Sequence, residues 1–404
     1  MRILMLNNEF PPLGGGTGVV NYHLLEELAS YQEVWVDLVT SSRSHHDYET
    51  ERFAKRITIY KTPVDNHNIH HATNQELLRY SWRGLLKSRE LLKQQRYNLS
   101  FAFAGVPAGA ISYALKLSHK LPYLVSLQGA DIPGFEARYN WLYPLLKPVL
   151  RRIWRNAGVV TAISKQHQLL AHQTMPELDI PIIYNGVNTQ TFQPFDYFRQ
   201  DLEINILCVG RLIERKGQHH LLRAFANLCA IYDRPLRLIL AGTGDAEAAL
   251  HRLATDLGVA EQVNFIGFVS RNDMPTVYPQ ADIFVLASQN EGMSIALLEA
   301  MASGLPVVVT DTGGTAELVR EDLNGYTVPW ADVSKLTEAL AKLVKDQEIR
   351  QQMGRESRRV ASQFSWPAIT RQYVDLCEDI VAQSRPASTP ARWLPTRDLI
   401  FSDK

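Results

Sequence analysis

The feature that most constrains the fold is a repeated alternation of short apolar runs with amphipathic segments. In the N-terminal half, the runs RILMLNN, VWVDLVTS, YNLSFAFA and PYLVSLQG are apolar along most of their length, and VVNYHLLEELAS and PAGAISYALKLSHK lie between them. Strands that are apolar on both faces and alternate with helices are typical of a parallel sheet covered on both sides. This half of the chain is therefore predicted to form one doubly wound α/β domain.

The same alternation returns after a turn-rich stretch near residues 186–202. Strand-like runs INILCVGRL, PLRLILAG, VNFIGFV, ADIFVLAS and PVVVTD alternate with GQHHLLRAFANLCAIY, GDAEAALHRLATDLG and GTAELVRE. The pattern predicts two Rossmann-like domains facing a cleft, over residues 1–190 and 191–365, then a helix over 366–382 and a poorly ordered tail over 383–404. Such a pair of domains holds its ligand at the carboxyl ends of the strands.

Composition excludes several classes of function. The 404 residues contain 42 Lys and Arg against 42 Asp and Glu, and this zero net charge argues against nucleic acid as the main partner. Three distant cysteines without CxxC spacing indicate a reducing compartment and no structural zinc. The N-terminus is too short for a signal peptide, and no apolar run approaches the ~20 residues of a membrane span. We expect a cytoplasmic protein, with association at the inner membrane face left open.

The stretch EGMSIALLEAMASG, residues 291–304, raises the first question about function. It is apolar almost throughout, yet Glu291 precedes it and Glu299 stands in its middle. Ser294 is placed to cap a helix that ends at Gly304, so the backbone amides of residues 292–294 would face the cleft. Such a helix start suits a phosphate or a sugar oxygen.

Glu299 has two interpretations. An unpartnered carboxylate among Ala, Leu and Met would cost several kcal/mol. The residue therefore either lies on a thin solvated stripe of the helix or accepts hydrogen bonds from vicinal hydroxyls, as acidic residues do with nucleotide ribose. The strand, the glycine turn and the two flanking acids favour the ribose.

A second constellation is CVGRLIERKG, where an apolar strand ends at Gly210 and delivers Arg211 and Lys216 to one end of the sheet. Arginine offers a two-pronged donor to phosphate oxygens, and lysine offers a mobile point charge. Either residue alone could be a solvated loop cation. The pair directly after a parallel strand favours a diphosphate site.

The third constellation is the glycine-rich NNEFPPLGGGTGVV, with Gly14, Gly15, Gly16 and Gly18 between the first strand and the first helix. Glycines let a backbone approach an anionic ligand closely and present its amides. The stretch does not fit GxGxxG, because Val19 takes the last glycine position, and it lacks GxxxxGK[ST]. Both misses count against a dehydrogenase and an NTPase.

Together these motifs resemble those of the retaining GT-B glycosyltransferases of family 4, which transfer a sugar from a nucleoside-diphosphate sugar. The resemblance runs from Met1 to about Asp379. It is carried by the glycine-rich loop, AISKQ (162–166), YNGVN (184–188), GRLIERKG (210–217), LAGTGD (240–245) and EGMSIALLEAMASGLPVV (291–308). The last of these contains the E-x7-E pattern of the family as Glu291 and Glu299.

The resemblance implies a role for each residue. Arg211 and Lys216 would neutralise the donor diphosphate, Glu299 would bind the ribose, and Glu291 would contact the transferred sugar. The backbone at Gly210, Gly292, Met293 and Ser294 would support the sugar and phosphates, with Gly15 and Gly16 approaching from the other domain. The two cations make a metal or other cofactor unnecessary, and we expect none. The helix over 366–382 would cross back to the N-terminal domain, which would bind a glycan, lipid-linked or small-molecule acceptor.

One departure concerns proton transfer. Where many members carry a histidine, in the loop after PYLVSL, this chain has Gln128, which cannot take a proton near neutral pH. Asp131, three residues on, is the nearest group able to act as a base. It could equally cap the following turn.

The stretch RYNWLYPLLKPVLRRIWRNAG, residues 138–158, mixes Trp141 and Trp154 with several basic residues, as an interfacial helix does. That would suit a lipid-linked acceptor at a membrane surface. The alternative is an ordinary amphipathic helix that packs its Trp and Leu inward and is broken by Pro144 and Pro148. The small number of basic residues favours this alternative.

The sequence thus predicts a metal-independent, retaining glycosyltransferase that uses a nucleotide sugar. Two other functions remain. A nucleotide-sugar epimerase of the same architecture would use the same diphosphate and ribose contacts without an acceptor. A non-catalytic nucleotide-sugar-binding protein is conceivable because Gln128 replaces a group that can carry a proton.

Overall fold

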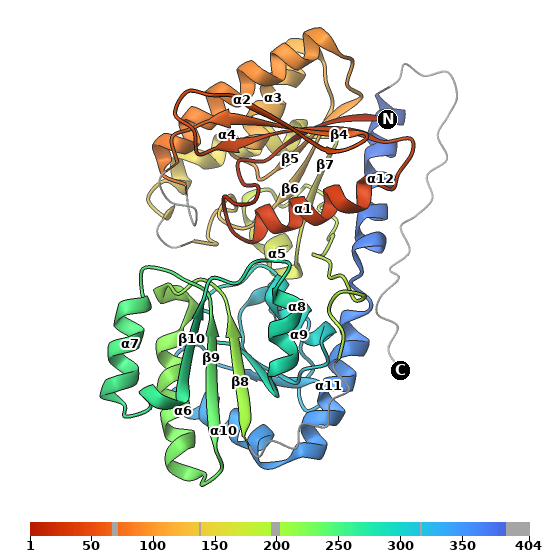
Figure 1. The fold of residues 1–404 in the computed structure, drawn as a ribbon. Coiled ribbons are helices and arrows are strands. Elements are labelled where there is room, and N and C mark those ends of the chain that lie inside the picture. The colour runs from red at the N-terminus through yellow and green to blue at the C-terminus, as the bar shows by residue number, and fades with distance from the viewer. Residues whose placement is uncertain (67–71, 137–138, 195–202, 316, 385–404) are drawn as a thin grey trace.

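The computed structural model describes residues 1–66, 72–136, 139–194, 203–315 and 317–384. In these ranges the chain forms two α/β domains, which lie one above the other in Figure 1, and each is built on its own sheet. The predicted fold class, two Rossmann-like domains, is confirmed. Nearly all of the tail predicted over 383–404 lies outside the described residues.

The N-terminal domain has a seven-stranded sheet in the order β3-β4-β2-β1-β5-β6-β7, in which β3 runs antiparallel to β4 and the other neighbours are parallel. Its strands are β1 (Arg2–Leu6), β2 (Trp35–Ser42), β3 (Glu49–Ala54), β4 (Ile57–Pro63), β5 (Leu99–Phe103), β6 (Tyr123–Leu127) and β7 (Val159–Ala162). Its helices are α1 (Gly16–Leu28), α2 (Asn74–Gln94), α3 (Ala108–His119), α4 (Tyr143–Asn156) and α5 (Lys165–Thr174).

The C-terminal domain has a parallel six-stranded sheet in the order β10-β9-β8-β11-β12-β13. Its strands are β8 (Ile204–Val209), β9 (Leu236–Ala241), β10 (Val263–Gly267), β11 (Ile283–Leu286), β12 (Val307–Thr310) and β13 (Gly325–Val328). Its α-helices are α6 (Gln218–Ile231), α7 (Glu247–Asp256), α8 (Met274–Val277), α9 (Ile295–Ala302), α10 (Val333–Lys345) and α11 (Gln347–Ala361). Short 3-10 helices are η2 (Glu214–Lys216), η3 (Ala260–Gln262), η4 (Tyr278–Gln280) and η5 (Gly313–Thr315).

Each sheet has one central strand at which the chain order reverses. In the first sheet β1 lies between β2 and β5, and in the second β8 lies between β9 and β11. Open α/β sheets bind ligands at the carboxyl ends of the strands beside such a reversal. The glycine-rich loop follows β1 and the Arg211–Lys216 segment follows β8, so both motifs stand at these positions.

Two local expectations are wrong. In the described part of GTAELVRE, which leaves out Ala316, the predicted helix is absent: η5 makes one turn, and Glu317 accepts hydrogen bonds from the backbone of Lys165 (2.6 Å) and Gln166 (3.3 Å). These bonds tie the segment to the start of α5. The prolines also do not break α4, because Pro144 stands in its first turn, where no N–H is needed, and the helix continues through Pro148.

The final helix, α12 (Trp366–Gln383), packs against α1, β5 and β6 of the N-terminal domain (Figure 1). Trp366, the first residue of α12, packs against Gly186, where a β-carbon would come within 2.6 Å of the Trp366 ring. Further along, the Tyr373 hydroxyl lies 3.0 Å from Ser126 Oγ at the end of β6. The glycine of the YNGVN motif therefore makes room for the start of α12.

Candidate functional site

The first part of the site is an ion pair at the end of β8. Lys216, the last residue of η2, donates from Nζ to Glu291 Oε1, and the two side chains are only 14% and 11% exposed. Gly217 follows with φ +67°, and a β-carbon there would lie 1.9 Å from the carbonyl oxygen of Ala287. Only glycine fits this turn, which fixes Lys216 over the loop that follows β11.

The charge of Glu291 is set by this pairing. Burial on its own would raise the pKa of Glu291, but the adjacent Lys216 ammonium and its hydrogen bond outweigh burial and hold the pKa below its ordinary value. The carboxylate therefore stays ionised in the cleft. The Glu291 carboxylate and the Lys216 ammonium group therefore stand together at the position where the sequence predicts binding of the sugar and the diphosphate.

Arg211 belongs to the same cluster and faces the other domain. Burial lowers the pKa of Arg211, and Glu9 and Glu291 act in the opposite direction. A β-carbon at Gly15 would lie 3.8 Å from the Arg211 guanidinium, so the glycine-rich loop reaches this cation across the cleft. Gly16 is the first residue of α1. Gly210 follows β8 directly, and a β-carbon there would lie 4.0 Å from Cε of Lys216.

The loop before α9 completes this side of the cleft. Ser294 caps the helix as predicted, because its Oγ accepts from the backbone N–H of Leu297 at 3.3 Å. The carbonyl oxygen of Met293 accepts from Asn185 Nδ2 at 3.0 Å. At Gly292 a β-carbon would come within 2.6 Å of the His167 ring. Close packing against His167 of α5 therefore requires glycine at 292.

Glu299 lies on α9, apart from the Lys216–Glu291 pair. The residue as a whole is partly exposed, but its carboxyl group is buried, and this burial raises the pKa of Glu299 to about 7. The Tyr278 hydroxyl donates a hydrogen bond to Glu299 Oε2 at 2.6 Å, and this bond partly lowers the pKa of Glu299 again. The nearby positive charge of Arg271 lowers this pKa as well. The Glu299 carboxyl group is therefore expected to change between its ionised and protonated forms near neutral pH.

Sequence reasoning missed both neighbours of Glu299. Tyr278 and Arg271 come from the connection between β10 and β11, which carries no motif. Arg271 also reaches the N-terminal domain, because its guanidinium lies 4.5 Å from the centre of the Tyr22 ring on α1. The separation of Arg271 and Glu299 in the sequence gives no sign that the two side chains lie close together.

Gln128 and Asp131 follow β6 on the opposite side of the cleft. Asp131 accepts hydrogen bonds from the backbone amides of Gly105 (2.7 Å), Gln128 (3.1 Å) and Gly129 (2.9 Å). Gln128 donates from Nε2 to Ser126 Oγ at 2.8 Å. Burial raises the pKa of Asp131, although the amides oppose this shift. The contacts show Asp131 holding the loop, and its role in proton transfer stays a prediction.

This loop meets the Glu291 loop directly. Asn290 donates from Nδ2 to the carbonyl oxygen of Phe135, whose ring packs edge-on against His167 at 4.6 Å between centroids. His167 is fully buried, burial lowers its pKa to about 4, and neither ring nitrogen has a hydrogen-bond partner among the described residues. The two domains are therefore in contact beside the predicted sugar position.

Known families match both halves of the chain. The model of "Glycosyltransferase Family 4" matches residues 14–191, and that of "Glycosyl transferases group 1" matches residues 189–360. The chain is a GT-B glycosyltransferase of family 4 and group 1. Curated relatives of this glycosyltransferase include the GDP-mannose-dependent alpha-(1-6)-phosphatidylinositol monomannoside mannosyltransferase of Mycobacterium tuberculosis, which is 26% identical and covers 93% of this chain and 97% of its own. Another is the N-acetyl-alpha-D-glucosaminyl L-malate synthase of Bacillus anthracis, at 23% identity with 93% and 96% covered.

Solved structures support the same fold for this glycosyltransferase. Sucrose-phosphate synthase from Thermosynechococcus elongatus superposes with a TM-score of 0.81 at 21% identity, covering 95% of this chain and 100% of its own. The Anabaena protein HepE in complex with UDP and glucose gives 0.72 at 22% identity, with 94% and 99% covered. The likeness extends across both domains, so both belong to the GT-B fold.

Proposed function

We propose that this glycosyltransferase moves a sugar from a nucleoside diphosphate to an acceptor hydroxyl, with retention of anomeric configuration and without a metal ion. The observation that carries the proposal is the cluster of Arg211, Lys216 and Glu291 at the reversal point of the C-terminal sheet, with Gly15 of the other domain against Arg211. This cluster offers two cations suited to a diphosphate and one acid suited to a sugar, which supports the proposal.

The cluster suits the chemistry of glycosyl transfer. Breaking the anomeric C–O bond leaves negative charge on the diphosphate, and cations that are already in position lower the barrier to that charge. In the proposed same-face reaction the acceptor oxygen bonds to the anomeric carbon while the departing phosphate takes the acceptor proton. Gln128 cannot take a proton, so a phosphate base fits this site.

The proposal that no metal ion is needed rests on Arg211 and Lys216. Across the described ranges, no three side chains of His, Cys, Asp or Glu gather as ligands of a metal would. Arg211 and Lys216 would then supply the positive charge that a divalent cation supplies elsewhere.

The function is tested by a thermal-shift screen of UDP-, GDP- and ADP-sugars in EDTA, followed by product analysis with the donor that binds. We expect one nucleotide to stabilise the protein, since a ligand that binds only the folded state raises Tm. Turnover should be unchanged by EDTA, and NMR of the glycoside should show the anomeric configuration of the donor. A requirement for added Mg²⁺ or Mn²⁺, or an inverted product, would contradict the proposal.

The two alternative functions give different products in this assay. An epimerase would convert the donor sugar without an acceptor. A binding protein would show the thermal shift but no turnover with any acceptor, and Glu291→Ala would alter its affinity alone.

We also propose that the protein contacts membranes through the start of α4. Three apolar residues spaced four apart are turned outward, Trp141 (68% exposed), Leu145 (70%) and Val149 (48%), while Trp154 is buried. Exposed basic residues, among them Arg152 and Arg155, follow on the same helix. An apolar stripe beside cations is typical of an interfacial helix. A lipid acceptor, as named for the mycobacterial relative, would fit this arrangement.

Sedimentation with vesicles containing phosphatidylglycerol tests this contact. No described helix is long and apolar enough to cross a membrane. We expect the wild type to sediment with vesicles and the variant Trp141→Ser/Leu145→Ser to stay in solution. Ile231→Ser is the control, because Ile231 is 65% exposed on α6 of the other domain. Wild-type protein that remains in the supernatant would remove the proposal.

A further inference from the structure

The first turn of α5, in the N-terminal domain, packs against two loops of the C-terminal domain, the ones that follow β11 and β12. Glycines in these loops leave room for it. A β-carbon at Gly313 would lie 1.5 Å from Gln166 Oε1, just as one at Gly292 would meet the His167 ring. Gly314 joins the two loops, because a β-carbon there would lie 1.6 Å from the carbonyl oxygen of Gly292. We call Gly292, Gly313 and Gly314 the glycine seat of α5.

The C-terminal domain also supplies hydrogen-bond acceptors for the first backbone amides of α5. Glu317 Oε1 accepts from the N–H of Lys165 at 2.6 Å and from that of Gln166 at 3.3 Å. Ser164, the N-cap residue of α5 itself, accepts only from the N–H of His167, at 3.2 Å. The first amides of a helix have no partner within the helix, and a carboxylate beside them is also favoured by the helix dipole. Glu317 therefore completes the cap of a helix that belongs to the other domain.

The glycine seat borders the acid that is proposed to contact the transferred sugar. A β-carbon at Gly313 would lie 3.0 Å from the carbonyl oxygen of Glu291, and Gly292 is the next residue of the chain. The Glu291 side chain is held from the other side by Lys216. The loop that carries Glu291 is thus packed between Lys216 and α5. A shift of α5 on the seat would move the N-terminal domain relative to this acid.

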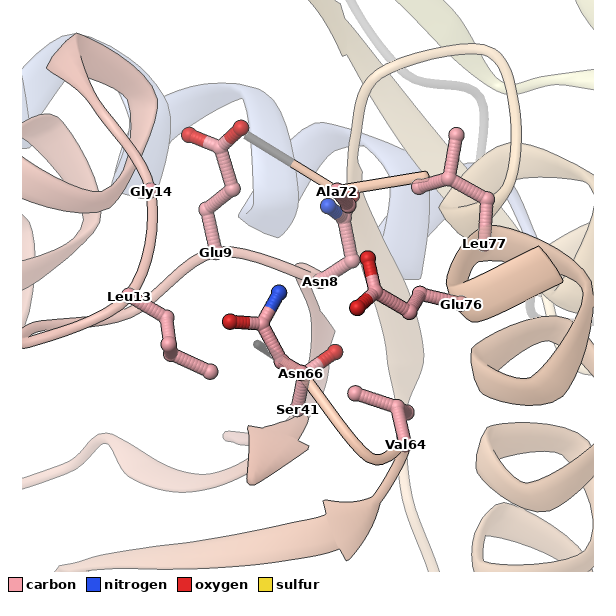
Figure 2. Close-up of a pocket in the computed structure, with 10 residues that line it drawn as sticks. All are labelled: Asn8, Glu9, Leu13, Gly14, Ser41, Val64, Asn66, Ala72, Glu76 and Leu77. Carbon is pink, nitrogen blue, oxygen red and sulfur yellow. The ribbon is translucent and has the colours of Figure 1, made fainter. Parts of the chain in front are cut away.

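The hollow beside the glycine-rich loop does not hold the acceptor of the proposed reaction. Figure 2 shows this hollow at the carboxyl ends of β1, β2 and β4, where its lining includes Asn8, Glu9 and Gly14. Its volume of about 10 Å³ is enough for about one water, so no sugar ring fits there. We therefore expect the acceptor hydroxyl to meet the donor between the domains. The rate of transfer then depends on how the two domains are held against each other.

We propose that Glu317 is a positioning residue: through the start of α5 it holds the N-terminal domain against the Glu291 loop before the donor binds. The inference rests on the proposed glycosyl transfer and adds the contact that sets the two domains for it. The side chains proposed to bind the donor, Arg211, Lys216 and Glu299, all belong to the C-terminal domain. Loss of the Glu317 contact should therefore slow transfer while affinity for the donor stays nearly the same.

Hydrogen exchange followed by NMR tests the contact in the protein without donor. The amides of Lys165 and Gln166 can be protected only by a partner outside α5, because the first amides of a helix have none within it. In wild type we expect these amides to exchange about tenfold more slowly than in Glu317→Ala. Glu317→Gln keeps an acceptor oxygen, so its exchange rates should stay close to those of wild type.

Steady-state kinetics test the positioning role. With the donor found in the thermal-shift screen, Glu317→Ala should lower kcat by about tenfold to 100-fold, because displaced reacting groups meet less often in the productive geometry. Its KM for the donor should stay within about threefold of wild type, since Arg211 and Lys216 are untouched. Glu317→Gln should restore most of kcat. Lys165→Pro should act like Glu317→Ala, because proline suits the first position of a helix but has no N–H to donate.

Asp332→Ala is the matched control, because Asp332 caps α10 inside the C-terminal domain by accepting from the N–H of Lys335 at 2.9 Å. It should lower Tm about as much as Glu317→Ala does and leave kcat unchanged. An equal fall of kcat in the two variants would show that Glu317 acts on stability alone.

Two further outcomes would overturn the proposal: equal exchange at Lys165 in wild type and Glu317→Ala, or a raised donor KM with unchanged kcat. If Glu317→Ala does not fold, Lys165→Pro carries the test, because it breaks the same contact from the side of α5. The exchange measurement needs no donor, which keeps the two proposals separate. Absence of turnover in wild type would count against glycosyl transfer and leave the contact of Glu317 with α5 standing.

Discussion

Replacing Lys216 by methionine is expected to lower kcat by about 100- to 1,000-fold, the loss typical when one preorganised donor to a developing charge is removed. Lys216 is held by the turn at Gly217 and points at Glu291, so its ammonium is in place before the donor arrives. Methionine keeps a side chain of similar length and removes the charge. Release of nucleoside diphosphate under donor saturation is the measurement.

The same substitution should destabilise the protein, and this effect must be separated from catalysis. Without Lys216 the largely buried Glu291 carboxylate has lost its partner, which typically costs about 3–5 kcal/mol. The double variant Lys216→Met/Glu291→Gln removes both charges, so its Tm should recover toward that of wild type while its turnover stays low. Recovery of turnover together with Tm would show that Lys216 acts only on the fold.

The central architecture could be predicted because its strands are buried on both faces. Runs such as ILML in β1 and IFVL in β11 are apolar without alternation, which is typical of parallel strands. β3 was not predicted, since its sequence ETERFA is largely polar and the strand is exposed at the sheet edge. The failure at GTAELVRE has a similar origin, because hydrogen bonds to α5 from another part of the chain override the local pattern.

The positions of the candidate-site residues could be predicted where these residues directly follow a strand. Contacts between residues far apart in the sequence could not. Arg211 and Lys216 come directly after β8, so their position follows from the sheet. The Lys216–Glu291 contact joins residues far apart in sequence, and no spacing rule predicts it. Tyr278 and Arg271 carry no motif, and their proximity to Glu299 depends on how the β10–β11 connection packs against α9.

Donor binding is expected to weaken about tenfold between pH 8 and pH 6, because a carboxyl group with a pKa of about 7 goes from mostly ionised to mostly protonated over this range. We propose that the ribose hydroxyls donate to ionised Glu299. A protonated carboxyl group accepts these bonds less well, so binding must be accompanied by loss of a proton. Calorimetric Kd values for the donor across this pH range are the measurement.

Two variants assign the effect to Glu299. Glu299→Gln should bind the donor at least tenfold more weakly than wild type at pH 8 and should lose the pH dependence. Tyr278→Phe removes the hydroxyl that donates to the carboxylate, which raises the pKa of Glu299 further and moves the midpoint above 7. A pH dependence that survives in Glu299→Gln would place the titrating group elsewhere.

Stability should change in the opposite direction from donor binding. The pKa of Glu299 is raised in the folded protein, so its contribution to stability is present below the ordinary value of 4.5 and is lost as the pH rises through about 7. Without donor, Glu299→Gln should therefore have a higher Tm than wild type at pH 8 and a smaller advantage at pH 5. Saturating donor should reverse the order at pH 8, because the carboxylate that costs stability in the empty cleft then accepts the ribose hydroxyls.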